Sequence, residues 1–147
     1  MNSFGRYIFF VFMSLCASCS EHSGVEKERN IFLNFKSYQS SGKFEIENPK
    51  FKKVANEINE ARLQQYRRDD YQLSGDAMGL MLITFFDDRL MQVIFYPSDC
   101  SHYQELFSAL RPHDTGVDMI YDIDYKGACY ASWSDQKLQA EYDYFVQ

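Results

Sequence analysis

The sequence predicts an α+β fold, in which an antiparallel sheet carries two helices on one face. Beyond residue 30, short apolar runs of alternating type are separated by turn-forming residues, whereas only two segments have helical spacing. The chain has 147 residues, of which 46% are hydrophobic and 24% charged, so it is large enough for one packed domain. We expect this single α+β domain to span residues 31–147.

The two expected helices are marked by their caps and stop signals. The first begins at Asn48-Pro49, where Asn supplies the cap and Pro the first helical residue, and extends to about Arg62. The second is capped by Ser98 or Asp99 and ends at Arg111-Pro112. The apolar residues at helical spacing are Phe51, Val54, Ala55, Ile58 and Ala61 in the first helix, and Tyr103, Leu106, Phe107 and Leu110 in the second.

The strands are predicted from apolar patterns between tight turns. We expect them at 31–35, 43–47, 67–73, 79–86, 89–96, 117–125, 129–133 and 137–146. The segments 79–86 and 89–96 form the strongest hairpin, which Asp87-Asp88 closes. In the last segment a clean alternation predicts an inward face made of Leu138, Ala140, Tyr142, Tyr144 and Val146.

A weak internal repeat relates the two halves of the domain. The segment 85–90 aligns with 133–138 at an offset of 48, with an aromatic residue, an Asp turn, a basic residue and a Leu in common. The repeat favours two αβββ units, whose layout resembles that of periplasmic inhibitor and outer-membrane assembly lipoproteins. A single sheet without duplication is the alternative, because such short matches also arise by chance.

The first 18 residues have the parts of an export signal. Arg6 gives a positive start, and the apolar stretch 7–15 is less than half as long as a membrane-spanning helix. Cys16-Ala17-Ser18-Cys19 resembles the lipobox of bacterial lipoproteins, in which small residues precede the cysteine that receives the lipid. The resemblance implies that Cys19 is lipidated; an ordinary cleaved signal without lipid is the alternative.

The residue after the cysteine indicates the membrane at which the protein is expected to be retained. In lipoproteins with this signal an Asp there favours the inner membrane, and Ser20 therefore implies the periplasmic face of the outer membrane. Residues 19–30 then form the lipidated cysteine and a polar tether. Without Arg6, the exported part keeps 14 of the 15 basic residues and all 21 acidic ones, for a net charge of −7. This acidity argues against nucleic acid as a partner.

The remaining cysteines, Cys100 and Cys129, form an even pair in an oxidising compartment, so we expect a disulfide. Asp99-Cys100-Ser101 also resembles the Asp-Cys-Ser segment of NlpC/P60 cell-wall peptidases, whose nucleophilic cysteine lies at a helix start. In that family Gly follows and a His lies on a strand well downstream. Here His102 follows, and His113 is the only later histidine. The disulfide is therefore favoured over the nucleophile.

Other chemical sites are not indicated. The segment 122–127 resembles the opening of a calcium loop, but Lys126 and Trp133 occupy positions that need oxygen ligands. The three histidines lack metal-ligand spacing, and the sequence has no Gly-rich phosphate loop and no Gly-x-Ser-x-Gly. We therefore expect no catalysis, no metal and no cofactor.

Aromatic residues make up 17% of the chain, more than one buried face needs. In the central hairpin, Phe85, Met91 and Phe95 share one phase, opposite Phe86, Leu90, Ile94 and Tyr96. We expect the second set to pack under the helices and the first set to face a protein partner. If the N-terminal hairpin covers that face instead, the acidic strand edge at Asp118, Asp122 and Asp124 is the alternative surface.

Taken with the missing catalytic set, these features favour a non-catalytic periplasmic lipoprotein that binds a protein, as an inhibitor or an immunity-type module does. An accessory lipoprotein of envelope assembly and a cysteine cell-wall peptidase that uses Cys100 are the alternatives. The lipid would attach the protein to the membrane.

Overall fold

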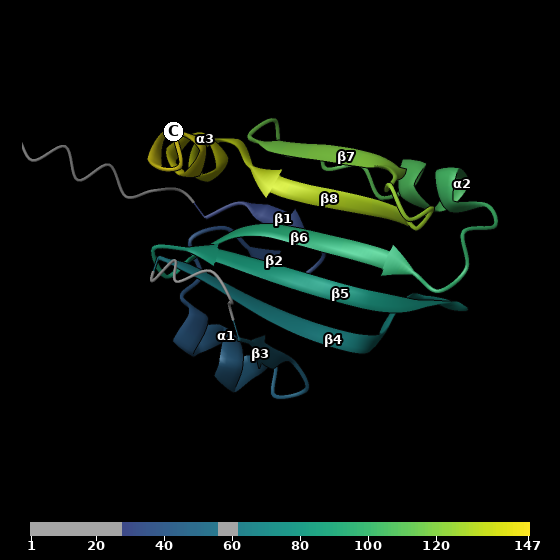
Figure 1. Cartoon of the computed structure of the whole chain (residues 1–147), viewed down its shortest axis with the longest axis horizontal. Helices are drawn as coiled ribbons and strands as arrows, with labels where there is room; N and C mark the ends of the chain where they lie inside the picture. Colours follow the sequence, from purple (N-terminus) through teal and green to yellow (C-terminus); the bar gives the residue numbers. More distant parts are fainter. Residues whose placement is uncertain (1–27, 56–61) are drawn as a thin grey trace, which may run out of the picture.

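The computed structural model describes residues 28–55 and 62–147, and it confirms the α+β class (Figure 1). Six strands form one antiparallel sheet in the order β3-β4-β5-β6-β8-β7, and β1 and β2 form a separate hairpin. The strands are β1 (Asn30–Phe32), β2 (Phe35–Lys36), β3 (Lys52–Val54), β4 (Leu63–Ser74), β5 (Ala77–Phe86), β6 (Arg89–Pro97), β7 (Val117–Ile123) and β8 (Cys129–Asp135). The helices are α1 (Ser41–Glu47), α2 (Tyr103–Ser108) and α3 (Gln136–Phe145).

The central hairpin forms as the sequence predicts. Strands β5 and β6 pair along their length, and Asp87 and Asp88 join them. Both aspartates have positive φ, 49° and 60°, which is the geometry of a two-residue turn that matches the twist of the strands. Asp88 also accepts hydrogen bonds from the backbone N–H and the hydroxyl of Ser41, so the turn fixes the start of α1.

The main core lies on one face of the sheet, beneath the β1–β2 hairpin, α1 and α2. It joins side chains of the sheet to Phe32 and Phe35 of the hairpin, Phe44 of α1 and Phe107 of α2. Its sheet residues are Tyr66, Met81, Ile83, Phe85, Leu90, Val93, Phe95, Val117, Ala131 and Trp133. Two helices, α1 and α2, thus cover this face, although only α2 lies where a helix was expected.

The third helix packs on the opposite face, at one end of the sheet only. Phe86, Met91 and Leu138 form a small buried cluster, against which Tyr38, Leu63 and Tyr142 pack. Phe86 points away from the main core because neighbouring residues of a strand point to opposite faces. Figure 1 shows α3 at the end of β8 and α2 at the other end of the β7–β8 pair.

The C-terminal strand predicted at 137–146 is wrong, because this segment is α3. The carboxylate of Asp135 accepts hydrogen bonds from the backbone N–H groups of Lys137 and Leu138, which caps the helix. Leu138, Tyr142 and Phe145 then lie on one side of it, and ring contacts join the two aromatic residues to Phe86. Leu138 and Tyr142 fit both periods, and the cap decides between them, whereas Tyr144 and Val146, also expected to face inward, are exposed.

The predictions for the N-terminal part are also corrected. The expected strand 43–47 belongs to α1, because the Ser40 side chain caps a helix by accepting from the N–H of Lys43. The expected helix from Asn48 is interrupted by β3, which pairs with β4; its residues 56–61 lie outside the described residues. The expected strand 31–35 is divided into β1 and β2, with Leu33 at a φ of 50°.

The internal repeat does not extend to the architecture. Phe85 and Trp133 are both buried in the main core, as the alignment suggests. After Asp135, however, the chain enters a helix where the first half continues as a strand. The second half is therefore α2-β7-β8-α3 and not an αβββ unit.

Candidate interaction surface

The three residues predicted to face a partner are buried, so that prediction is wrong. Phe85 and Phe95 are 0% exposed and belong to the main core, and Met91 is 2% exposed in the cluster beneath α3. Phe85 lies at 5.3 Å from the Phe44 ring, centroid to centroid, and Phe95 at 6.4 Å from the Tyr71 ring. These residues stabilise the fold and offer no contact surface.

A β-bulge explains why the phases were misassigned. Thr84 pairs with Gln92 while Phe85 pairs with Leu90, so that Met91 is an extra residue in β6. Leu90 therefore shares a face with Phe85 instead of with Ile94. A simple alternation through residues 89–96 cannot reproduce this, because one inserted residue reverses the direction of every side chain before it.

The opposite face of the sheet carries apolar side chains that the described helices leave accessible. We call this set the open-face stripe; it consists of Leu80, Leu82, Ile94, Tyr96, Ile120 and Tyr130. Leu82 pairs with Ile94, and Leu80 with Tyr96. Five of the six are half-buried and Ile120 is 61% exposed, in contrast to the fully buried residues of the main core.

Three residues of the stripe, Leu82, Ile94 and Ile120, lie in a row that crosses all six strands. The paired residues along it are Lys52, Arg67, Leu82, Ile94, Ser132 and Ile120. The row has Lys52 and Arg67 at the β3–β4 edge, where Arg67 pairs with Asp69, and Leu82 and Ile94 in the middle. At the β7 edge, Asp118 and Asp122 flank Ile120 on the same face. The open face is thus acidic at its β7 edge.

Two tyrosines contribute an aromatic pair to the stripe. The rings of Tyr96 and Tyr130 lie 5.6 Å apart, centroid to centroid. Partial burial raises the pKa of Tyr96 above its ordinary value, and the negative charge of Asp124 adds to the effect. The Tyr96 hydroxyl therefore remains a neutral hydrogen-bonding group at physiological pH, on a face that is otherwise aliphatic.

Strand β7 is an outer strand of the sheet, and it carries Ile120, the most exposed residue of the stripe. The structure pairs it with β8 and with no other described strand. Asp118 and Asp122 are exposed, and within residues 28–55 and 62–147 neither has an ion pair with another side chain. Gln136 donates to Asp118 Oδ1 at 2.7 Å, which leaves the charge uncompensated.

Asp124, the third acidic residue predicted for this edge, has a structural role. Its Oδ1 accepts hydrogen bonds from the N–H groups of Lys126 and Ala128, at 2.8 and 2.9 Å. These bonds close the turn between β7 and β8, where Gly127 has a φ of 81°. The alternative surface predicted from the sequence is therefore carried by Asp118 and Asp122, with Asp124 at its end.

The predicted disulfide between Cys100 and Cys129 is present and joins the loop before α2 to the start of β8. The Asp99 carboxylate accepts from the N–H of Ser101, and this bond lowers the pKa of Asp99 below its ordinary value. The peptidase alternative needs a free Cys100 thiolate, and the disulfide occupies that sulfur. His102, directly after the motif, adopts a left-handed conformation before α2.

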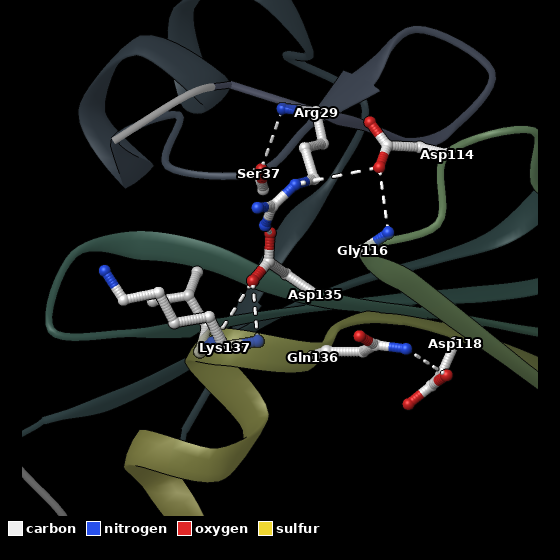
Figure 2. Close-up of polar contacts among 9 residues, drawn as sticks. Arg29, Ser37, Asp114, Gly116, Asp118, Asp135, Gln136 and Lys137 are labelled. Carbon is white, nitrogen blue, oxygen red and sulfur yellow. Dashed lines mark hydrogen bonds and ion pairs between the residues drawn. The ribbon is translucent and has the colours of Figure 1, made fainter. Parts of the chain in front are cut away.

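A buried carboxylate fixes the start of the described chain (Figure 2). Asp135 is 0% exposed, and its Oδ2 binds the Arg29 guanidinium at 2.9 Å. Arg29 also lies 3.7 Å from Asp114, and its N–H donates to the hydroxyl of Ser37. The hydrogen bond to Asp135 raises the pKa of Arg29 above its ordinary value. This cluster joins the N-terminal hairpin to the loop before β7 and to the α3 cap.

A shallow hollow of about 760 Å³ lies beside this cluster, between the β1–β2 hairpin and the segment 109–114. Basic and acidic side chains both line it: Arg29, Lys36, Arg111 and His113 with Glu28 and Asp114. Arg29 and Lys36 are engaged by carboxylates. The hollow therefore presents no concentrated charge of either sign.

Two further expectations concern metals and the anchor. Within the described ranges, no three His, Cys, Asp or Glu side chains come together in a way that could hold a metal ion. None of the helices there has the length and apolar character needed to cross a membrane. Cys19, the expected lipidation site, lies outside the described residues.

The sequence contains a pattern of polar residues that indicates which face of the sheet is accessible. Ser132 and Ser134 alternate with the apolar Ala131 and Trp133 in β8, and Gln92 precedes Ile94 by two residues in β6. These polar residues share a face with Ile94, as the strand register shows. They could have marked this face as the accessible one, but only once β6 and β8 were known to be neighbours.

Comparison with known proteins gives no relative: the chain matches no family model, no curated protein and no solved structure.

Proposed function

We propose that the protein is a non-catalytic, lipid-anchored module of the periplasm that binds a protein partner. The open-face stripe carries this proposal. Its aliphatic and aromatic side chains form an apolar centre with charged residues at its margins, which is the arrangement typical of protein interfaces. An inhibitor or an immunity-type module would use such a face to cover one partner.

The charge of the face indicates the kind of partner. The exported chain has a net charge of −7, and the carboxylates of Asp118 and Asp122 at the β7 edge have no ion pair with any described side chain. A basic protein would pair with these groups, and long-range attraction would accelerate its binding. The Cys100–Cys129 disulfide suits the oxidising periplasm in which we place the protein.

A capture experiment with variants tests this function. The full chain, purified in detergent, is used as bait in a periplasmic extract beside the double variant Ile94→Ala/Tyr96→Ala. We expect the wild-type chain to retain a basic protein and the double variant to lose it, because interface aromatics often contribute about 2 kcal/mol each. Melting curves verify that both proteins are folded.

Ile46→Ala is the matched control, because Ile46 is 83% exposed on α1, away from the stripe. It should retain the partner as the wild-type chain does. Retention of the same protein by the double variant would contradict the use of the stripe. A wild-type chain that retains no protein at all would contradict the proposed function.

A further inference from the structure

We infer that β7 binds an extended strand of the partner, whose sequence places basic residues on both sides of an apolar one. The strand would add to the sheet as a seventh strand, antiparallel to β7. This inference rests on the proposed function and specifies the recognition element within it. It follows from the backbone of β7, from its side chains and from its charge.

The hydrogen bonds on either side of β7 show which of its backbone groups are directed outward. Gln136 N–H donates to Gly116 O, and Asp124 N–H donates to Ala128 O. Since hydrogen-bonded pairs alternate in an antiparallel ladder, residues 118, 120 and 122 bond to β8. Residues 117, 119, 121 and 123 therefore direct their N–H and C=O groups away from the sheet.

Two of these four residues have N–H groups available for a new strand. The N–H of Val117 donates to Asp114 O, and the N–H of Ile123 donates to Asp122 Oδ1. For Met119 and Tyr121, the described part of the chain supplies no acceptor in this direction. Strand edges of this kind are the sites at which an extended peptide pairs with a sheet.

The side chains of β7 define what the added strand must carry. Asp118, Ile120 and Asp122 point to the open face, because they pair with Ser134, Ser132 and Tyr130 of β8. Residues of the new strand opposite these three would form the closely spaced, non-hydrogen-bonded pairs, in which side chains lie nearest. Opposite charges across the two aspartates, and an apolar residue across Ile120, are therefore favoured.

The required pattern is thus basic-x-apolar-x-basic. The two intervening residues would lie opposite Met119 and Tyr121, which are half-buried on the α2 side and pack against the main core. These positions supply the backbone hydrogen bonds, and the three others supply the specificity. The apolar residue would also extend the open-face stripe beyond Ile120.

A second copy of the chain fits this edge less well. If two β7 strands paired about Ile120, Asp118 of each copy would lie opposite Asp122 of the other. Like charges directly opposite each other destabilise a strand pair. The same carboxylates that attract a basic strand therefore oppose self-association in this register.

The test uses the peptide Thr-Lys-Thr-Val-Thr-Lys-Thr with blocked ends, added to the purified full chain. We expect it to protect the backbone amides of Met119 and Tyr121 from hydrogen exchange and to shift their NMR signals. Two control peptides have Glu in place of both Lys residues, or Pro in place of the third and fifth residues. Each control should bind at least about tenfold more weakly, through charge repulsion or through the lost N–H donors.

A charge-matched pair of variants locates the effect on the protein. Asp118→Asn/Asp122→Asn should weaken binding of the Lys peptide at least about tenfold and remove most of its salt dependence. Asp76→Asn/Asp143→Asn removes the same charge from exposed sites on the β4–β5 turn and on α3, and should leave binding within about twofold.

Several results would overturn the inference. They are equal binding of the Lys and Glu peptides, undiminished binding of the Pro peptide, unchanged amides of Met119 and Tyr121 at about 1 mM Lys peptide, and dimerisation of the chain through β7. If the capture experiment still yields a partner that depends on Ile94 and Tyr96, the proposed function stands without strand addition. If the peptide test and the capture experiment both fail, the strand addition and the proposed function are both contradicted.

Discussion

The side chain of Asp135 connects several separate parts of the molecule. Its side chain caps α3, pairs with Arg29 of the N-terminal segment and lies at the end of β8. A buried carboxylate is costly unless it is both paired and hydrogen-bonded, and Asp135 meets both conditions. The cap determines that residues 136–145 form a helix, and α3 in turn covers only one end of the second face.

Tyr66 provides a test of the core through pH. It is 1% exposed, and its hydroxyl donates to Glu45. Burial, reinforced by this bond, raises the pKa of Tyr66 to about 12 from an ordinary 10.0. A raised pKa means that the folded state favours the neutral phenol. The stability that it contributes is complete below pH 10 and is lost as the pH rises toward 12.

We therefore expect the free energy of unfolding to fall between pH 10 and 12, by about 2 kcal/mol from the raised pKa of Tyr66 alone. Tyr66→Phe should show a shallower fall in urea unfolding over this range, although it loses about 1 kcal/mol at pH 8 with the hydrogen bond. Tyr125→Phe, at a 92% exposed site, should behave as the wild-type protein does. An identical pH slope for Tyr66→Phe would contradict the shifted pKa.

At the scale of elements, local chemistry was predictable and long-range pairing was not. The turn at Asp87-Asp88 and the strands on both sides of it follow from adjacent residues. The identity of α3 depends on a cap that pairs with Arg29, more than 100 residues earlier in the chain. The sequence alternation of residues 137–146 also fits a strand, and nothing local excludes it.

The candidate site was mispredicted for a related reason. Strand β5 is apolar on both faces, so its sequence does not tell which face the helices cover. The answer depends on the bulge at Met91 and on β8 lying next to β6, two features of pairing between distant segments. Asp118 and Asp122 were identified correctly as exposed, because alternation in 117–123 places them opposite Val117, Met119 and Tyr121.

The disulfide is an element-scale constraint, and its contribution can be measured. It closes a loop of 29 residues that contains α2 and β7. The chain-entropy model gives about 3.5 kcal/mol for such a loop. We expect Cys100→Ser/Cys129→Ser to unfold at a correspondingly lower urea concentration.

Reductant supplies the matched comparison. It should lower the unfolding midpoint of the wild-type chain to that of the double variant and leave the variant unchanged. Thiol labelling of the denatured, unreduced protein should find Cys100 and Cys129 blocked. A wild-type midpoint that does not respond to reductant would contradict a stabilising bond.

At the scale of the whole molecule, the two faces of the sheet are covered to different extents. The hairpin, α1 and α2 cover one face with the main core, whereas α3 covers only one end of the other. The accessible remainder has Lys52 and Arg67 on one side and Asp118 and Asp122 on the other. Because Arg67 is paired with Asp69, the two aspartates at β7, which have no ion pair among the described residues, would orient a partner, placing its basic segment there.

The proposed tether would determine where this face lies relative to the membrane. Arg29 holds the described chain beside Asp114 and Asp135, close to the first residue of β7. Arg29 lies ten positions after Cys19, a distance of at most about 35 Å when fully extended. With a lipid on Cys19, as we propose, the β7 edge would stay within a short distance of the membrane surface.

The last prediction concerns that anchor. Cys19→Ala should release the protein from the membrane fraction or stall its processing, because no other residue in the proposed signal would carry the lipid. Cys16→Ala is the matched control, since Cys16 leaves with the signal, and it should fractionate as the wild-type protein does. Mass spectrometry of the mature chain should show a lipid-bearing N-terminus at Cys19. Unchanged membrane fractionation and mature mass for Cys19→Ala would contradict the lipoprotein assignment, and the open face would then belong to a soluble secreted domain.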